Sequence, residues 1–385
     1  MAGNKLRIVH ISTVHSDSDT RIFEKECRSL AEKDHEVSLI IPADRDEVRK
    51  GINIKALPIL KDRFRRMTFG TITAARNAFS ENGGINHLHD PELLPLGLLL
   101  RATGRRVVYD MHENLPEQIR TKHWIHPLIR KALAAIISIF ERMTLNSMAV
   151  IMAESSYAID YDWVKKSQIV LNLPKVEELI KLENATQRGQ KDEFLVGYIG
   201  GVSRERGILT VVEALKGLRS ESLPIKFKCV GNKSKEVAAD QIYQEGIKEG
   251  WIISPGRMPP NLGWPLIARC HLGIALLKPI GNYVGSYPTK MFEYMAMGLP
   301  VVVSDFPLYR DVVERHQCGF CVNPDDVSAV ADAIRFLVKN PEYGREMGQR
   351  GQQAVIEHYN WNSELEKLLN FYRSLFGENK PLLSG

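Results

Sequence analysis

The chain has 385 residues, which is too long for one ordinary hydrophobic core and predicts two domains of similar size. Its 44% hydrophobic and 25% charged residues are typical of a soluble globular protein. The formal net charge of +5 is too small to indicate nucleic-acid binding, and no apolar run is long enough to span a bilayer. The start, "MAGNKLRIVHIS", also lacks an apolar signal core. We therefore expect a cytoplasmic protein.

Strands and helices alternate along the first half of the chain. The segment "LRIVHIS" (6–12) predicts a buried strand, and residues 20–34 predict an amphipathic helix. Further strands are expected at "EVSLIIP", "INHLHD" and "RRVVYDMHE". This alternation predicts a parallel sheet covered by helices on both faces.

A long apolar helix is predicted for "HWIHPLIRKALAAIISIFERM" (123–143). It is either a buried helix of the domain or a helix whose exposed apolar face lies on an anionic bilayer. We favour burial of most of this helix. The basic segments "KDRFRRM" (61–67) and "RATGRR" (101–106) then become the expected contact with the inner face of the membrane.

The polar stretch from Leu182 to Glu193 interrupts the pattern and marks the expected domain boundary. Strands resume at "FLVGYIGG" and continue at "IKFKCVG", "HLGIALL", "LPVVVSD" and "GFCVNP". We therefore predict a first domain over residues 1–180 and a second over residues 190–358. Ligands of such sheets bind at the carboxyl ends of the strands.

The stretch "YIGGVSRERG" has features of an anion-binding loop. Gly200 and Gly201 allow a tight turn, and Arg204 and Arg206 precede a predicted helix. Glycines, cations and a helix N-terminus together suit a phosphate. The motif matches neither the dinucleotide nor the Walker fingerprint, and a tight turn with solvated arginines is the alternative.

The stretch "SYPTKMFEYMAMGLPVVVSD" (286–305) would supply the other half of such a site. No Asp or Glu occurs from Gly250 to Phe292, although Arg257, Arg269, Lys278 and Lys290 do. A diphosphate pocket favours such an excess of cations. A carboxylate one turn into the helix, Glu293, suits the two hydroxyl groups of a ribose, or else pairs with Lys290 in solvent.

Polar residues of the first half allow several interpretations. His87 and His89 lie on one face of a strand, but the only other candidate ligand pair is His112-Glu113, so we predict no metal site. Asp19 and Arg21 follow the first strand as acceptor contacts or as a helix cap with a salt bridge. Cys318 and Cys321 have redox spacing outside a redox context, so we expect reduced thiols.

Several motifs together resemble one enzyme family. They are "SYPTKMFEYMAMGLPVVVSD", "YIGGVSRERGILTVVEAL" and "CGFCVNPDD", preceded by "HSDSDTRIFEKECRSLA", "HLHDPELLPLG", "VVYDMHE" and "VLNLP". In order and spacing they resemble the retaining GT-B glycosyltransferases of family four. The resemblance implies an α/β GT-B fold, with two doubly wound Rossmann-like domains that face a central cleft. It also implies that a C-terminal helix at about 360–376 crosses back to the first domain.

The resemblance implies a role for each matching residue. Glu293 would bind the nucleotide ribose, Arg206 the diphosphate, and His112 the transferring sugar or the leaving phosphate. The remaining donor-side matches are Gly200, Gly201, Arg257, Met258, Ser286, Thr289 and Lys290, with Asp19, Arg21 and His89 on the acceptor side. A second family glutamate is replaced here by Gly285.

The implied function is retaining transfer of a sugar from a nucleotide diphosphate sugar, with a UDP-sugar favoured. The expected acceptor is a lipid-linked or polysaccharide precursor, and no metal, cofactor or nucleic acid is expected. His112, Arg206 and Lys290 would be the catalytic residues. The alternatives are a nucleotide-sugar epimerase or hydrolase on the same fold, and a non-catalytic nucleotide-sugar-binding partner of another transferase.

Overall fold

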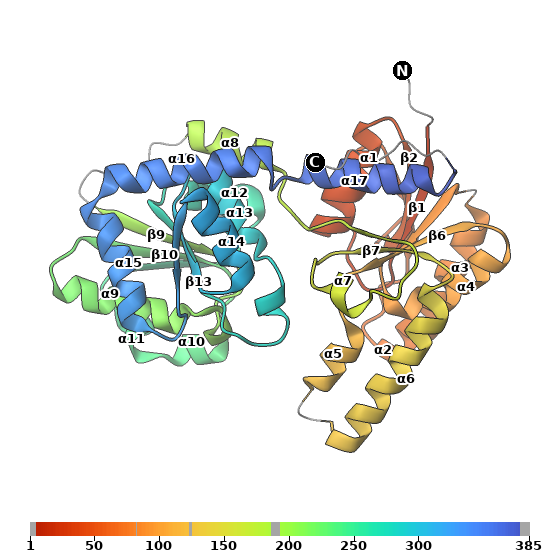
Figure 1. Cartoon of the computed structure of the whole chain (residues 1–385), viewed down its shortest axis with the longest axis horizontal. Coiled ribbons are helices and arrows are strands. Elements are labelled where there is room, and N and C mark those ends of the chain that lie inside the picture. Colours follow the sequence, from red (N-terminus) through yellow and green to blue (C-terminus); the bar gives the residue numbers. More distant parts are fainter. Residues whose placement is uncertain (1–4, 82, 123–124, 186–192, 378–385) are drawn as a thin grey trace. The chain divides into compact units, whose positions relative to one another are not determined.

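The computed structural model describes residues 5–81, 83–122, 125–185 and 193–377, which form two compact units (Figure 1). Unit 1 comprises Met1–Asn172 and Asn362–Gly385, and unit 2 comprises Leu173–Trp361. The division lies before the polar stretch that the sequence suggested as the boundary. Helix α8 (Val176–Ala185) therefore belongs to unit 2 rather than to the first domain.

Unit 1 contains an eight-stranded sheet within the described residues, in the order β3-β4-β2-β1-β5-β6-β7-β8. All neighbouring strands pair in parallel except β3 and β4. The strands are β1 (Arg7–Ile11), β2 (Glu36–Pro42), β3 (Glu47–Arg49), β4 (Ile52–Leu57), β5 (Ile85–Leu88), β6 (Arg106–Met111), β7 (Ala149–Met152) and β8 (Ser167–Ile169). Mostly apolar side chains fill both faces of the central strands, as expected of a sheet covered by helices on each side.

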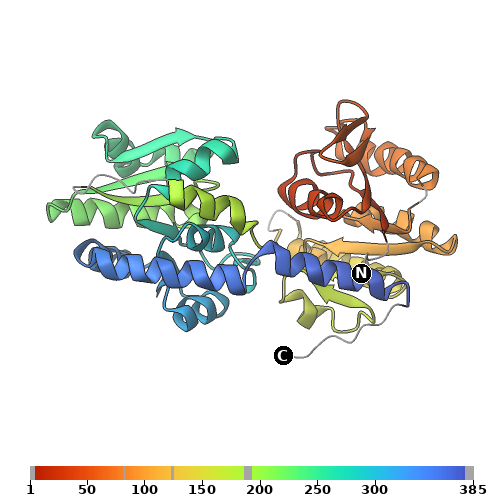
Figure 2. The same cartoon turned by 90° about the horizontal axis from the view of Figure 1, so that it is seen from above.

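Helices cover the sheet of unit 1. Those described are η1 (Thr20–Cys27), α1 (Arg28–Glu32), α2 (Arg63–Arg65), η2 (Arg66–Gly70), α3 (Thr71–Ser80), η3 (Pro91–Leu93), α4 (Leu94–Ala102), α5 (Leu115–Arg120), α6 (Pro127–Leu145), α7 (Tyr157–Asp160) and the C-terminal α17 (Trp361–Ser374). Helix α17, at the blue end of the chain in Figure 2, returns to unit 1. Its Leu368 and Tyr372 are completely buried.

Unit 2 contains a six-stranded parallel sheet, counted over its described residues, in the order β11-β10-β9-β12-β13-β14. The strands are β9 (Phe194–Ile199), β10 (Ile225–Val230), β11 (Ile252–Gly256), β12 (Leu272–Ala275), β13 (Val301–Ser304) and β14 (Gly319–Val322). The helical segments are α8, η4 (Arg204–Arg206), α9 (Ile208–Ser220), α10 (Lys235–Ala239), α11 (Gln241–Lys248), α12 (Pro260–Ala268), η5 (Tyr283–Gly285), α13 (Thr289–Ala296), α14 (Pro307–His316), α15 (Val327–Lys339) and α16 (Pro341–Glu357).

The strand order of each unit reverses at one point. In unit 1 the first strand, β1, lies between β2 and β5, and in unit 2 β9 lies between β10 and β12. Such topological switch points open a crevice at the carboxyl ends of the strands, where doubly wound proteins bind their ligands. The two units therefore each have one position at which a site is expected.

The expected burial of the long apolar helix is wrong. In α6 the apolar residues are mostly exposed, including Leu128 at 72%, Ile136 at 63% and Met143 at 73%, whereas Ala134 and Leu145 are buried. Helices α5 and α6 protrude from the rest of unit 1 in Figure 1. Among the described residues, no helix is both long and apolar enough to cross a bilayer.

Candidate active site

A pocket of about 620 Å³ lies in unit 2 beside the carboxyl ends of β9, β10 and β12. It is bounded on one side by the start of α13. The pocket brings together all nine unit 2 residues that the sequence suggested, namely Gly200, Gly201, Arg206, Arg257, Met258, Ser286, Thr289, Lys290 and Glu293. They come from three separate loops, from η4 and from α13, so their convergence is a result of the fold.

Two glycine turns form the floor of this pocket. Gly200 has φ +137°, and a Cβ there would lie 2.9 Å from the Nζ atom of Lys290. Gly231, after β10, has φ +148°, and its Cβ would lie 1.7 Å from the carbonyl oxygen of Gly200. Both positions therefore require glycine. Gly231 was not among the residues suggested by the sequence. Its position directly after a predicted strand, in "KCVGN", is the feature that could have indicated it.

Lys290 is a buried cation at the pocket wall. Its side chain is 8% exposed, and its Nζ atom lies 3.0 Å from the hydroxyl oxygen of Tyr198 and 4.3 Å from the centre of that ring. Burial and the nearby guanidinium of Arg206 lower the pKa of Lys290 to about 7. An anion bound here would favour the protonated amine and so offset part of the cost of burying its charge.

Arg206 ends η4, and its guanidinium lies 5.8 Å from the centre of the Tyr283 ring. Glu293 lies one turn into α13, just beyond Lys290. The other two cations of the acid-free stretch, Arg269 and Lys278, are not in the lining of this pocket. Lys278 contacts the carboxylate of Asp325 and the hydroxyl of Thr210, and Arg269 is exposed after α12.

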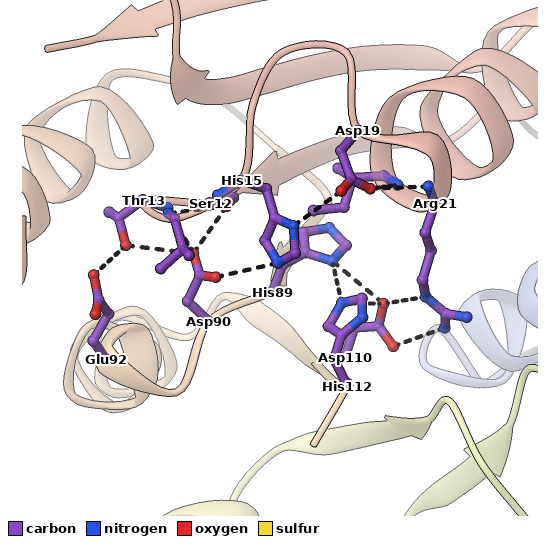
Figure 3. A network of polar contacts seen from close by, with 12 residues as sticks. Ser12, Thr13, His15, Asp19, Arg21, His89, Asp90, Glu92, Asp110 and His112 are labelled. Atoms are coloured by element: carbon purple, nitrogen blue, oxygen red, sulfur yellow. Dashed lines mark hydrogen bonds and ion pairs between the residues drawn. The ribbon is translucent and has the colours of Figure 1, made fainter. Parts of the chain in front are cut away.

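A polar network lies at the switch point of unit 1 (Figure 3). Its centre is Asp110 on β6, which is completely buried. Arg21 donates two hydrogen bonds to its carboxylate, at 3.0 Å and 2.9 Å, and the Nε2 atom of His112 lies 3.1 Å from Oδ2. Burial opposes ionisation of Asp110, but Arg21 and then His112 hold its pKa well below the ordinary value. Asp110 was not among the residues suggested by the sequence.

The acceptor-side residues suggested by the sequence meet in this network. Asp19 caps η1 by accepting hydrogen bonds from the backbone N–H groups of Arg21 and Ile22. Arg21 and His89 are only 4% and 2% exposed. Both side chains contact Asp110 inside the protein, and their direct contact with an acceptor stays a prediction. Asp19 caps η1 and Arg21 forms a salt bridge with Asp110, so both have the structural roles that the sequence offered as the alternative.

A second turn beside the network is fixed by Asp90. Its Oδ2 atom accepts hydrogen bonds from the hydroxyl of Ser12 at 2.9 Å and the backbone N–H of Thr13 at 2.6 Å. The hydroxyl of Thr13 in turn donates to Glu92 at 2.6 Å (Figure 3). These contacts join the loop after β1 to the start of η3, so they hold the two edges of the switch point together.

The cysteine pair lies at the start of a strand and not at the start of a helix. Cys318 is buried and Cys321 lies on β14, and both are free thiols. Burial raises the pKa of each thiol to about 12. Since the thiolate is the reactive form, this shift disfavours redox chemistry at the pair.

Comparisons with known proteins agree with this architecture. The family model "Glycosyl transferases group 1" matches residues 181–354, and "Glycosyltransferase Family 4" matches residues 20–161. A poly(ribitol-phosphate) alpha-N-acetylglucosaminyltransferase of Staphylococcus aureus is 25% identical over 53% of this chain and 40% of its own length. The chain thus spans less than half of that relative.

Solved structures match almost the whole chain. The sucrose-phosphate synthase of Thermosynechococcus elongatus has a TM-score of 0.72 at 16% identity, and the match covers 97% of this chain and all of that one. Anabaena HepE, solved with UDP and glucose, has a TM-score of 0.69 at 13% identity and is matched over 96% of this chain and all of its own. At this identity the likeness shows the fold, and the predicted GT-B architecture is confirmed. Each half of the chain therefore matches a glycosyltransferase family model, and the fold that joins them is GT-B.

Proposed function

We propose that this protein transfers a sugar from a nucleotide diphosphate sugar, with a UDP-sugar favoured, to a glycan or lipid-linked acceptor of cell-surface polysaccharide synthesis. The observation that carries the proposal is the pocket of unit 2. It combines a glycine turn, the two cations Arg206 and Lys290, and the carboxylate of Glu293 at a topological switch point. The cations suit a diphosphate, and a carboxylate beyond them suits the hydroxyl pair of a ribose.

In the proposed reaction the bond between the anomeric carbon and the diphosphate breaks while the acceptor oxygen bonds to the same face of the sugar. The leaving phosphate oxygen takes the proton of the acceptor hydroxyl, so the anomeric configuration is retained. Arg206, Lys290 and the backbone N–H groups at the start of α13 would stabilise the growing negative charge. This assignment gives charge stabilisation to protein cations, with no metal or cofactor among the proposed participants.

The base of the nucleotide is assigned to the backbone near Arg257 and Met258, between β11 and α12. Thermal unfolding in the presence of UDP, GDP or ADP tests the donor assignment, because a ligand that binds only the folded state raises the unfolding temperature. We expect the largest shift with UDP. A chain that shifts with none of the three diphosphates would contradict the donor site.

We also propose that unit 1 rests on an anionic membrane surface. Helix α4 packs against α3 and α6, and all three expose apolar residues. These are Ile72, Leu98, Leu99, Leu128, Ile129, Ile136, Ile139 and Met143, with Phe64, Met67 and Phe69 on the adjoining α2 and η2. Exposed cations on the same helices include Arg63, Arg65, Arg76, Arg101 and Lys131. Apolar side chains beside cations complement a bilayer of anionic lipids and would bring the enzyme to a lipid-linked acceptor.

A further inference from the structure

Three histidines are buried together beneath the polar network of unit 1. His10 on β1 pairs in register with His87 on β5, and His89 follows that strand on the same face. All three are between 0% and 2% exposed, as is Glu26 of η1 at 1%. Burying so many polar groups costs free energy unless each finds a partner. The cluster therefore needs a physical explanation.

A metal cage is the first candidate, because three imidazoles and a carboxylate form a donor set that zinc accepts. The orientation of the rings argues against it. The Nδ1 atom of His10 and the Nε2 atom of His89 are 2.9 Å apart, while the ring centres are 5.2 Å apart and the ring planes differ by 13°. The rings thus meet edge to edge, with the two nitrogen atoms pointing at each other. An ion about 2 Å from each nitrogen does not fit between them, but a hydrogen bond does.

A second pair of imidazole nitrogens meets one step nearer the surface, where both face a carboxylate instead of each other. The Nδ1 atom of His89 lies 3.4 Å from the Nε2 atom of His112, with the ring centres 5.7 Å apart. Asp110 lies beside this junction, where its Oδ2 atom is 3.3 Å from His89 and 3.1 Å from His112 (Figure 3). A continuous row therefore runs from buried His10 through His89 and Asp110 to His112, whose side chain is 20% exposed.

The chemistry of imidazole fixes where the protons of this row lie. The ionised carboxylate of Asp110 only accepts hydrogen bonds, so the two ring nitrogens that face it carry protons. Neutral His89 is then protonated on Nδ1 and accepts on Nε2, which makes His10 the donor through Nδ1. The Nε2 atom of His10 then carries no proton, and it has no hydrogen-bond partner within the described part of the chain. The assignment thus accounts for each nitrogen of the row.

We propose that His10, His89 and Asp110 are positioning residues that hold His112 in the tautomer protonated on Nε2. Its Nδ1 atom then offers a hydrogen-bond acceptor to a hydroxyl group of a substrate. Arg21 keeps Asp110 oriented from the opposite side, through the two hydrogen bonds to its carboxylate. This inference rests on the proposed function for its meaning in catalysis, whereas the tautomers themselves are a property of the protein alone.

Two-bond proton–nitrogen correlation spectra of the ¹⁵N-histidine-labelled protein test the proposal. Histidine-to-asparagine variants at positions 10, 89 and 112 would assign the signals. We expect protonated Nδ1 in His10 and His89, and protonated Nε2 in His112. A His112 protonated on Nδ1 would overturn the proposal. So would stoichiometric Zn²⁺ binding by the chelator-treated protein that His10→Asn abolishes, since the cluster would then be a metal cage.

A matched pair of variants tests the effect on turnover. His89→Asn keeps an N–H group near the position of Nδ1, and His89→Leu removes it. We expect His89→Leu to lower kcat by on the order of tenfold with the donor KM unchanged, the scale of losing an orienting group one step from a site. His89→Asn should retain most of kcat. Equal losses in both variants would contradict the positioning role. If no transfer is found in the wild type, the proposed function fails while the spectra still decide the tautomers.

Discussion

At the scale of single residues, the donor pocket depends on a few side chains whose charge is set by their surroundings. Lys290 is held beside Tyr198 with a pKa lowered to about 7 by burial and by Arg206, so it is only partly protonated at neutral pH before a ligand binds. Glu293 shares its helix and favours the protonated amine. The pocket therefore gains positive charge when a diphosphate enters.

The affinity for UDP should fall as the pH rises through about 7, because Lys290 loses its proton there and the neutral amine no longer attracts the diphosphate. Calorimetric titrations well below and well above this pH, in buffers of different ionisation enthalpy, would show both the loss of affinity and proton uptake on binding. The variant Lys290→Met should bind weakly with little dependence on pH in this range. A wild-type affinity that stays constant across the range would contradict the assigned role.

Glu293→Gln should weaken UDP binding by on the order of tenfold, because hydrogen bonds from ribose hydroxyls to a charged acceptor contribute about 1.5–3 kcal/mol. The unfolding temperature without ligand should change little. Glu213→Gln is the matched control, since Glu213 is exposed on α9. Similar UDP affinities for the two variants in calorimetric titration would show that Glu293 does not bind the ribose.

At the scale of elements, backbone conformation at the ends of β9 and β10 shapes the pocket. Gly200→Ala would place a methyl group against Lys290 in a conformation that alanine rarely adopts, at a cost of about 1–3 kcal/mol of unfolding free energy. Donor binding should fall with it. Gly217→Ala is the control, because that glycine lies within α9 with open space around its Cβ position and should stabilise by about 0.5–1 kcal/mol. Urea unfolding that ranks the two variants the other way would refute the strained-turn account.

Substitutions in helix α6 test the proposed contact of unit 1 with a membrane. The double variant Ile136→Asp and Ile139→Asp should lose flotation with anionic liposomes, because it places charge on the exposed apolar face. Ile356→Asp, on α16 of unit 2, is the matched control with an exposed isoleucine. Wild-type protein that stays with the soluble fraction at low and moderate salt would end the membrane proposal.

Elements differ in how far the sequence predicts them. Alternating apolar strands and helices indicated the parallel sheets, because periodicity reports burial directly. The apolar composition of α6 suggested burial wrongly, since composition does not distinguish a face turned to the core from one turned outward. The buried state of Arg21 and His89 was also missed, because it follows from their pairing with Asp110, a residue 89 positions from Arg21 in the chain.

At the scale of the whole molecule, two units of similar construction each carry one set of polar residues at a switch point. The residues of the pocket were predicted largely through motif resemblance, since Gly200 and Lys290 are 90 positions apart and only the fold brings them together. Gly231 and Tyr198 were missed because a single glycine or a strand tyrosine has no motif of its own. The boundary after Asn172 was also missed, because α8 reads like part of the preceding domain.

The most direct test of sugar transfer is product formation from labelled UDP-sugars, with and without a bacterial lipid or glycan acceptor fraction. We expect a labelled acceptor with the anomeric configuration of the donor, formed only when acceptor is present. We also expect Arg206→Ala and Glu293→Ala to remove most of this activity while the protein stays folded. Donor conversion without acceptor would instead indicate an epimerase or hydrolase. Donor binding without any turnover would indicate a non-catalytic binding partner, and either result would contradict the account.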